Sequence, residues 1–306
     1  MPRSPLVLAA LASAAVPGLH PRSTHPTETS GNDFDTAVVT DSENRRWVVR
    51  APQRAAAGAQ LESELLLLAN LGDPTRTDLP FAVPAPKGHA SLPEGGRCVV
   101  YPYLPGAPLH PGELAPGPGL AAALGRALAA LHDVSRSVVE DAGLPVYEAT
   151  EYRERRLSEL DRAATTGHVP ARLLARWEKG LEDVGRWRFQ SCVVHGDLVA
   201  EHVLVDGQQV TGMLDWSDAK VADPADDLAW VAVGADSEAL DSVLEAYAVT
   251  RADSPDRHLA VRARLAGELA LARWLLHGVR SDDSSVVDDA GQMLRDLDSD
   301  VGGDPL

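Results

Sequence analysis

The sequence is poor in several features that define whole classes of protein. Aromatic residues make up only 5% of its 306 residues, so aliphatic and alanine side chains must fill any core. Its two cysteines, Cys98 and Cys192, are too few for a disulfide framework and do not have the spacing of a metal site. Both lie in apolar, strand-like runs, which favours buried and reduced thiols. No apolar run is long enough to span a membrane.

Positive charge is also scarce. The chain has 28 Lys and Arg residues against 45 Asp and Glu residues, which gives a net charge of −17. Because such a surface repels phosphate backbones, sequence-independent binding of nucleic acid is excluded as a function class. The hydrophobic fraction of 44% and the charged fraction of 24% are those of a globular protein with a substantial core.

The N-terminal run at residues 6–16 has two interpretations. It follows Arg3 and resembles the apolar core of a short signal peptide. It is also rich in alanine, the strongest helix former, and it ends at Pro17-Gly18, as an ordinary N-terminal helix would.

The remaining chain divides into a strand-rich first part and a helical second part. The first part has a predicted hairpin from strands 34–40 and 47–51, a helix over 55–71 and a strand over 97–103. A Pro- and Gly-rich passage follows and indicates a boundary or hinge. We therefore predict an α+β protein with a small N-terminal lobe, residues 1–104, and a larger, mainly helical lobe, residues 105–306.

Two short apolar strands near residue 205 flank a strong turn signal at residues 206–209. A hairpin closing there places His202 opposite Met213. Side chains two residues apart on a strand share a face, so His202 and Asp215 are expected to point the same way, about 7–8 Å apart at the backbone. This spacing suits two groups that converge on one ion.

Asp197 lies in the loop just before this hairpin. A carboxylate on a loop can orient an acceptor hydroxyl and take its proton, while a neighbouring pair of groups holds Mg²⁺ on phosphate oxygens. A carboxylate suits Mg²⁺ well, whereas the imidazole of His202 is a less usual ligand for so hard an ion. The combination predicts phosphoryl transfer from a nucleotide.

The residues Val194-His195-Gly196-Asp197-Leu198, together with Leu214-Asp215-Trp216, resemble the aminoglycoside phosphotransferase family, which has a protein-kinase-like fold. The segment 222–229 matches the usual continuation in that family. Most members have asparagine at the position of His202. This histidine and the run at residues 210–221 are similar to the macrolide 2′-phosphotransferase branch.

The resemblance implies a set of site residues. Asp197 is the catalytic base, and His202 and Asp215 hold the metal ions, which are Mg²⁺. The strand end at Tyr101–Leu104 is the hinge that reads the nucleotide base, with Tyr101 and Tyr103 as binding residues.

In the N-terminal lobe, the resemblance implies that Arg50 contacts phosphate and that Glu64 is its partner. Two alternatives stay open: Arg50 forms only a surface salt bridge, or Glu62 replaces Glu64 as the partner. No Gly-x-Gly-x-x-Gly sequence is present, and the only candidate for a nucleotide-covering loop is Ser30-Gly31-Asn32-Asp33.

Three polar residues near the motifs are predicted to be structural. His195 is expected to fix the loop by hydrogen bonds. Asp223 precedes a proline, and Asp227 opens a helix where its carboxylate can cap the helix and bond the catalytic loop.

We therefore predict a cytoplasmic phosphotransferase that uses Mg²⁺ and GTP, with ATP as an open alternative. Its acceptor is the 2′-hydroxyl of a macrolide antibiotic, which implies a role in antibiotic resistance. An apolar stripe at residues 269–279 suits such a substrate. Neither nucleic acid nor membrane is an expected partner. The alternatives are a kinase for aminoglycosides or another small alcohol, and a kinase-like binding protein without catalysis.

Overall fold

The computed structural model describes residues 2–26, 33–253 and 256–301 and divides into two compact units. Unit 1 comprises Met1–Leu109, Ser137–Leu144 and Ala200–Ala219. Unit 2 comprises His110–Arg136, Pro145–Val199 and Lys220–Leu306. Unit 1 holds most of the strands and unit 2 most of the helices, so the predicted α+β class is confirmed.

Unit 1 is built on an antiparallel sheet with the strand order β1-β2-β3-β5-β4 and a smaller sheet with the order β6-β8-β9. Its elements are α1 (Pro5–Ala15), β1 (Pro21–Pro26), β2 (Phe34–Asp41), β3 (Arg46–Pro52), α2 (Ala55–Asn70), α3 (Asp73–Asp78), β4 (Gly88–Ser91), β5 (Arg97–Pro102), β6 (Ala107–Pro108), α5 (Ser137–Glu140), the 3₁₀ turn η3 (Ala200–His202), β8 (Val203–Asp206) and β9 (Gln209–Met213).

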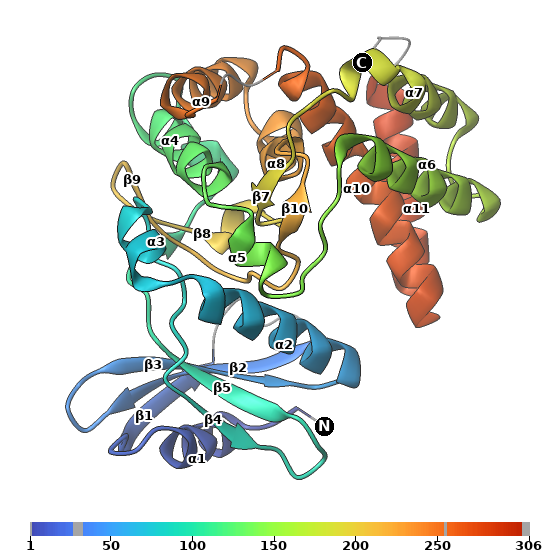
Figure 1. The fold of residues 1–306 in the computed structure, drawn as a ribbon. Helices are drawn as coiled ribbons and strands as arrows, with labels where there is room; N and C mark the ends of the chain where they lie inside the picture. The colour runs from blue at the N-terminus through green and yellow to red at the C-terminus, as the bar shows by residue number, and fades with distance from the viewer. Residues whose placement is uncertain (1, 27–32, 254–255, 302–306) are drawn as a thin grey trace. The chain divides into compact units, whose positions relative to one another are not determined.

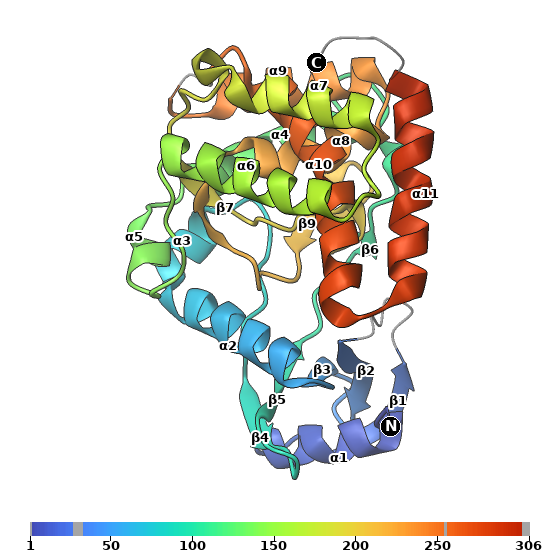
Figure 2. The same cartoon turned by 90° about the vertical axis from the view of Figure 1, so that its right-hand side faces the viewer.

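The predicted hairpin of β2 and β3 is present. Its side chains point alternately to the two faces of the large sheet, and each face is covered by a different helix. Trp47, Val49 and Ala51 on β3 are buried on one face, in a cluster with residues of α1. Helix α2 covers the opposite face (Figures 1 and 2). Because successive side chains of a strand point to opposite faces, Arg50 on β3 lies on the face that α2 covers.

The N-terminal run forms helix α1, which is part of the core of unit 1. The Ser4 hydroxyl caps it by accepting the N–H of Val7, and Leu8 and Ala12 on its inner face are at most 1% exposed. Strand β4 approaches α1 very closely, since a Cβ atom at Gly88 would lie 2.0 Å from a carbonyl oxygen of the helix. The helical interpretation of this run therefore agrees with the structure.

Unit 2 is mainly helical, as predicted, and among its described residues it pairs two short strands, β7 and β10. Its elements are η1 (Pro111–Glu113), α4 (Leu120–His132), α6 (Ala149–Thr165), α7 (Ala171–Glu182), η2 (Val184–Arg186), β7 (Cys192–Val194), β10 (Lys220–Ala222), α8 (Ala225–Gly234), α9 (Ser237–Thr250), α10 (Leu259–Ser281) and α11 (Ser284–Val301).

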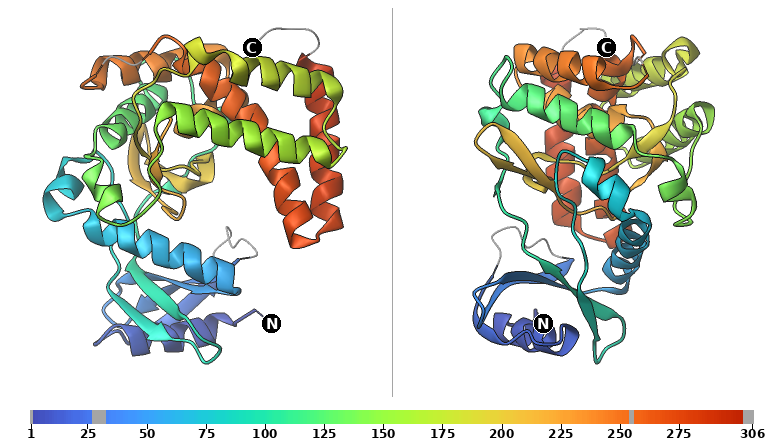
Figure 3. Two further views of the ribbon diagram at one scale, coloured as in Figure 1. Left: turned by 45° about the vertical axis from the view of Figure 1, so that its right-hand side comes forward. Right: turned by 60° about the vertical axis from the view of Figure 1, so that its left-hand side comes forward.

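The helices of unit 2 pack in neighbouring pairs, and four of them, α6, α7, α10 and α11, share an apolar core. Helix α9 lies along α4 (Figure 3), and α10 lies beside both α8 and α11 (Figure 2). Trp177 on α7 and Leu275 on α10 are fully buried in this core. With few aromatic side chains, most of the filling comes from alanine, leucine and valine, as the composition required.

The structure differs from the sequence prediction in several short elements. Strands β1, β4 and β10 and helix α3 were not predicted, because each has six residues or fewer and carries little periodic signal. Strand β9 ends at Met213, and α11 continues to Val301. Within the described residues, no helix has the length and apolar character that crossing a membrane would require.

Candidate active site

The predicted catalytic base, Asp197, lies in unit 2 on the loop that follows β7. This loop leaves the buried strand through His195, which is fully buried, and Gly196, whose φ of +84° favours glycine. Asp197 itself is exposed, whereas the next residue, Leu198, is 4% exposed. The loop is therefore anchored on both sides of a carboxylate that solvent can reach.

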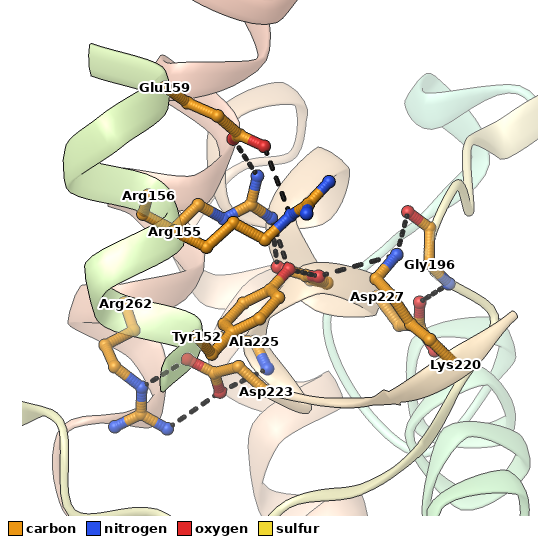
Figure 4. Close-up of polar contacts among 11 residues, drawn as sticks. Tyr152, Arg155, Arg156, Glu159, Gly196, Lys220, Asp223, Ala225, Asp227 and Arg262 are labelled. Atoms are coloured by element: carbon orange, nitrogen blue, oxygen red, sulfur yellow. Dashed lines mark hydrogen bonds and ion pairs between the residues drawn. The ribbon is translucent and has the colours of Figure 1, made fainter. Parts of the chain in front are cut away.

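Asp227, in the first turn of α8, holds this loop by its backbone. Its Oδ2 accepts the N–H of His195 at 2.8 Å. Its Oδ1 accepts the N–H of Gly196 at 2.9 Å (Figure 4). Burial opposes ionisation of Asp227, but the interaction with His132 and the backbone donors outweigh it and lower the pKa of the carboxyl. The prediction that Asp227 bonds the loop that carries Asp197 is confirmed.

Asp223 also has the structural surroundings that the sequence predicted. Arg262 binds it through two nitrogens at 2.7 and 3.0 Å, and the N–H of Ala225 donates to it at 3.0 Å (Figure 4). Asp223 and Arg262 are both at most 2% exposed. This buried pair ties the chain just before α8 to α10.

The hairpin that carries the predicted metal ligands closes at the predicted turn, but a β-bulge interrupts its pairing. Met213 lies opposite Val203 instead of His202. The N–H of Leu214 donates to the carbonyl oxygen of His202 at 2.9 Å. Because a one-residue shift of register reverses the side-chain faces, the prediction that the ladder puts His202 and Asp215 on one face is wrong.

Both of these residues lie beyond the regular ladder. His202 ends the turn η3, and Asp215 follows β9 with a left-handed φ of +63°. Trp216 fixes this segment, because its indole N–H donates to the carbonyl oxygen of Met213 at 2.9 Å and its ring stacks on Phe81. Left-handed backbone at a residue other than glycine is uncommon and recurs at functional sites.

Within unit 1, Arg50 brings together two carboxylates from distant parts of the sequence. Its Nη1 lies 3.0 Å from Oε2 of Glu64 on α2, and its Nη2 lies 3.1 Å from Oδ2 of Asp215. Glu62 pairs instead with Arg97, at 2.8 Å from Nε to Oε1. The sequence left Glu64 and Glu62 as alternative partners of Arg50, and in the structure the partner is Glu64.

This cluster is electrostatically strained. Glu64 is 1% exposed, and burial raises its pKa to about 7, with Arg50 opposing the rise and the negative charge of Asp215 adding to it. Burial opposes the charge of Arg50 as well, but the two carboxylates outweigh it and raise the pKa of the guanidinium. Among the described residues, the buried Oε1 of Glu64 has no hydrogen-bond partner.

The two predicted base-reading tyrosines lie in different surroundings. Tyr101 on β5 is 4% exposed, and its buried hydroxyl has no hydrogen-bond partner within the described part of the chain. Burial and the charge of Glu64 raise its pKa well above the usual value. Tyr103 follows β5 and is partly exposed, and the guanidinium of Arg46 lies 3.8 Å from the centre of its ring.

The donor chemistry of the predicted metal site fits Mg²⁺ in part. A carboxylate such as that of Asp215 is a ligand this ion prefers, and nucleotide sites commonly supply only one or two carboxylates beside phosphate oxygens and water. The imidazole of His202 is a softer ligand. Across residues 2–26, 33–253 and 256–301, no three His, Cys, Asp or Glu side chains gather in a way that could hold a metal ion.

The candidate nucleotide-covering loop is Ser30-Gly31-Asn32-Asp33, and its first three residues lie outside the described residues. Asp33 is described and forms an ion pair with Arg54.

Three side chains that contact the candidate site residues or the loop before Asp197 were not predicted from the sequence. The Phe34 ring lies under the guanidinium of Arg50, 4.3 Å from ring centre to Cζ, and Arg46 covers Tyr103. Strand alternation alone could have placed Arg46 on the same face as Arg50. The third, Lys220, lies with Nζ 3.3 Å from the carbonyl oxygen of Gly196, a contact that no sequence pattern signals.

Two curated proteins are similar to this chain. Uncharacterized protein YcbJ of Bacillus subtilis (strain 168) is 30% identical over 211 residues, which span 65% of this chain and 66% of that protein. Viomycin phosphotransferase of Streptomyces vinaceus is 31% identical over 204 residues, which span 63% of this chain and 70% of that protein.

Several solved structures are similar over almost the whole chain. The apoenzyme of macrolide 2′-phosphotransferase MphH from Brachybacterium faecium has a TM-score of 0.80 at 27% identity, covering 95% of this chain and 97% of that one. Macrolide 2′-phosphotransferase type I has a TM-score of 0.78 at 31% identity, covering 94% and 96%. The GDP complex of an aminoglycoside 2′-phosphotransferase-IIIa mutant has a TM-score of 0.80, covering 98% and 99%, and at 19% identity it shows the fold alone.

The family model of the phosphotransferase enzyme family matches residues 28–264, a span that contains Arg50, Glu64, Asp197, His202 and Asp215. The match covers well over half of the chain, and the structural neighbours have the kinase-like architecture predicted from the motifs. The chain therefore belongs to the phosphotransferase enzyme family, the aminoglycoside phosphotransferase family of the sequence prediction, and has its protein-kinase-like fold.

Proposed function

We propose that the protein transfers the terminal phosphoryl group of GTP to the 2′-hydroxyl of a macrolide antibiotic and thereby inactivates it. ATP is the alternative donor. The observation that carries the proposal is the similarity, over at least 94% of the chain, to two macrolide 2′-phosphotransferases at 27% and 31% identity. The aminoglycoside 2′-phosphotransferase-IIIa mutant has a comparable TM-score at 19% identity.

Asp197 is the proposed catalytic base. Its carboxylate is exposed on a loop whose backbone Asp227 holds at two adjacent amides. In this role it orients the acceptor hydroxyl and takes its proton as the oxygen attacks phosphorus. General-base catalysis of this kind typically contributes a factor of roughly 10²–10⁴ in rate.

Arg50 is the proposed phosphate-binding residue, in the lobe formed by residues 1–104. Its contact with the buried Glu64 orients the guanidinium, which offers a fork of donors and stays charged at every physiological pH. Tyr101 and Tyr103, at the end of β5, are the proposed contacts to the nucleotide base.

Asp215 and His202 would hold Mg²⁺ in this proposal. The ion, when bound, neutralises charge on the phosphate oxygens. Since Oδ2 of Asp215 lies 3.1 Å from Arg50 in this structure, the same carboxylate also helps to position the proposed phosphate-binding guanidinium.

The proposed acceptor-binding lobe comprises residues 105–306 and includes the apolar stripe on α10. Leu269 and Leu275 of that stripe are buried in the core and support the helix. Trp274 and Val279 are 41% and 48% exposed, so they are the members of the stripe that can meet a ligand. An exposed indole suits the apolar face of a macrolactone.

A second candidate is phosphorylation of a different antibiotic. Viomycin phosphotransferase, at 31% identity over 63% of this chain, favours this alternative. The protein's net charge of −17 would attract any cationic antibiotic, so charge alone does not separate the candidates.

Mass spectrometry of reaction products tests the proposal. Purified protein is incubated with Mg²⁺, with GTP or ATP in turn, and with separate panels of macrolides, aminoglycosides and viomycin. One added phosphoryl group on a macrolide, with GTP, is the expected result. Phosphorylation of viomycin or an aminoglycoside alone would overturn the macrolide assignment, and nucleotide binding without any product would favour a non-catalytic binding protein.

A further inference from the structure

Both backbone polar atoms of Gly196, the residue immediately before Asp197, contact a side chain. Its N–H donates to Oδ1 of Asp227 at 2.9 Å, and its carbonyl oxygen accepts from Nζ of Lys220 at 3.3 Å. Figure 4 shows both contacts, one at the carbonyl oxygen and one at the amide nitrogen of Gly196. Because Gly196 has a left-handed backbone with much conformational freedom, contacts at both atoms restrict it more than either would alone.

Lys220 comes from β10, the strand that pairs with β7 in the register Lys220 opposite Val194. Its side chain is only 17% exposed and also lies 4.0 Å from Oδ2 of Asp226. A charged donor to a carbonyl in partly buried surroundings gives a stronger hydrogen bond than a neutral one. Lys220 therefore connects the loop to Asp226 of α8. The amides of the loop are held by a different carboxylate of α8, that of Asp227.

Asp226 is itself fixed by α6. Its Oδ1 accepts from Nη2 of Arg156 at 2.9 Å, and the hydroxyl of Tyr152 donates to its Oδ2. Both partners are nearly buried, which keeps Asp226 from swinging toward solvent. The ammonium of Lys220 thus lies between a fixed carboxylate and the loop carbonyl.

On the other side of the loop, Asp227 is supported by two further buried residues. Nε2 of His132 on α4 lies 3.1 Å from Oδ2 of Asp227, and its Nδ1 lies 2.8 Å from the hydroxyl of Tyr247 on α9. Since an ionised carboxylate can only accept, Nε2 carries a proton, and in the neutral imidazole Nδ1 accepts from the tyrosine hydroxyl. His132 and Tyr247 are at most 2% exposed, so these contacts are shielded from bulk solvent.

We propose that Lys220 and the pair His132–Tyr247 are positioning residues for phosphoryl transfer, acting through the two polar atoms of Gly196 to hold the loop that presents Asp197. Lys220 holds the carbonyl oxygen of Gly196. His132, supported by Tyr247, holds the carboxylate of Asp227, which in turn accepts the amide N–H groups of His195 and Gly196. The inference rests on the proposed role of Asp197, whereas the hold on the loop itself does not depend on which acceptor or donor is used.

Hydrogen exchange measured by mass spectrometry on the peptide that contains His195 and Gly196 tests the hold directly. We compare the wild type with Lys220→Met, Tyr247→Phe and the matched control Lys179→Met, at an exposed site on α7. Lys220→Met keeps the length of the side chain, and Tyr247→Phe keeps the ring. The loop amides are expected to exchange about tenfold faster in both loop variants and at the wild-type rate in the control, because local opening becomes easier.

Steady-state kinetics on the acceptor found in the product screen give the second readout. Lys220→Met is expected to lower kcat about tenfold or more and to leave KM for the nucleotide nearly unchanged, because small misplacements of a reacting group can cost up to about 10²-fold in rate. Lys220→Arg, which restores a charged donor, is expected to recover part of kcat. Tyr247→Phe, which only loosens a supporting contact, is expected to lower kcat a few-fold.

Unchanged loop exchange in both Lys220→Met and Tyr247→Phe would overturn the proposal, as would unchanged kcat in Lys220→Met. If Lys220→Met does not fold, Tyr247→Phe decides alone, since it removes a single oxygen atom. A wild-type protein without activity on any acceptor would refute the proposed function but not the hold on the loop, which the exchange measurement still reads.

Discussion

Around Asp227 in unit 2, each carboxylate oxygen lies within 3.1 Å of a hydrogen-bond donor. Around Arg50 in unit 1, by contrast, the buried Oε1 of Glu64 and the buried hydroxyl of Tyr101 have no hydrogen-bond partner within the described residues. We call the first cluster closed, because both carboxylate oxygens of Asp227 accept hydrogen bonds, and it connects a loop to three helices. We call the second cluster open, because some of its buried polar atoms have no such partner among the described residues.

The difference matches the tasks we propose for the two regions. A loop that presents a catalytic base benefits from fixed geometry, because the base must lie within hydrogen-bond reach of one proton. A cluster that binds phosphate and a cation must exchange its internal contacts for contacts to the ligand. Buried polar groups without full satisfaction are costly, and they are commonly retained where function requires them.

The largest effect is expected from Asp197→Asn, which removes the base without altering its shape. Transfer should fall by roughly 10²–10⁴-fold, while nucleotide binding stays nearly unchanged. Product formation by mass spectrometry and nucleotide titration by calorimetry measure the two quantities. Transfer at the wild-type rate would refute the assignment of the base.

Asp227→Ala tests the closed cluster. The change leaves His132 and the two loop amides without their partner, so the free energy of unfolding should fall by about 3–5 kcal/mol. Urea unfolding measures it, with Asp161→Ala at an exposed position of α6 as the matched control. A loss no larger than that of the control would show that the cluster contributes little to stability.

Asp215→Ala tests the open cluster at its proposed metal ligand. The affinity for the nucleotide in the presence of Mg²⁺ should fall by about tenfold or more, because a carboxylate ligand is lost and Arg50 loses a partner. Calorimetric titration with and without Mg²⁺ measures the change, and Asp206→Ala in the exposed hairpin turn is the control. Equal affinity in Asp215→Ala and the wild type would remove Asp215 from the metal site.

The smallest expected effect is on the pH dependence of stability. Burial raises the pKa of Glu64 from 4.5 to about 7, so the folded state binds this proton more tightly than the unfolded state. The contribution of Glu64 to stability is therefore complete below about pH 4.5 and declines as the pH rises through 7.

Glu64→Gln removes this titration, so the free energy of unfolding should change less between pH 4.5 and 7 than in the wild type. Urea unfolding at a series of pH values measures the slope. Glu62→Gln, at the exposed neighbour that pairs with Arg97, should leave the slope as it is. An identical slope in Glu64→Gln would mean that the buried carboxyl titrates as it does in the unfolded chain.

Much of this arrangement follows from local patterns in the sequence. The helix from Ala55 onward, the hairpin of β2 and β3, and the turn between β8 and β9 were predicted, because periodicity and turn residues act over short distances. The pairing of Arg50 with Glu64 was inferred from family spacing, and the bond from Asp227 to the loop that carries Asp197 was inferred from its place at a helix start.

The register of the β8–β9 hairpin was predicted incorrectly for a definite reason. The extra residue of a β-bulge leaves no signal in the apolar pattern, yet it reverses the face of every side chain beyond it. The position of Asp215 therefore depends on its left-handed backbone and on the packing of Trp216, rather than on ladder alternation.

What the sequence determined by itself is the family and the fold class, together with a set of candidate site residues, because these depend on short motifs and local periodicity. What only the tertiary structure decided is which charges meet. The contacts of Asp227 with His132 and of Lys220 with Gly196 join segments far apart in the chain, as does that of Arg50 with Asp215. Such pairings depend on how the elements pack, and packing is a property of the whole fold rather than of any one segment.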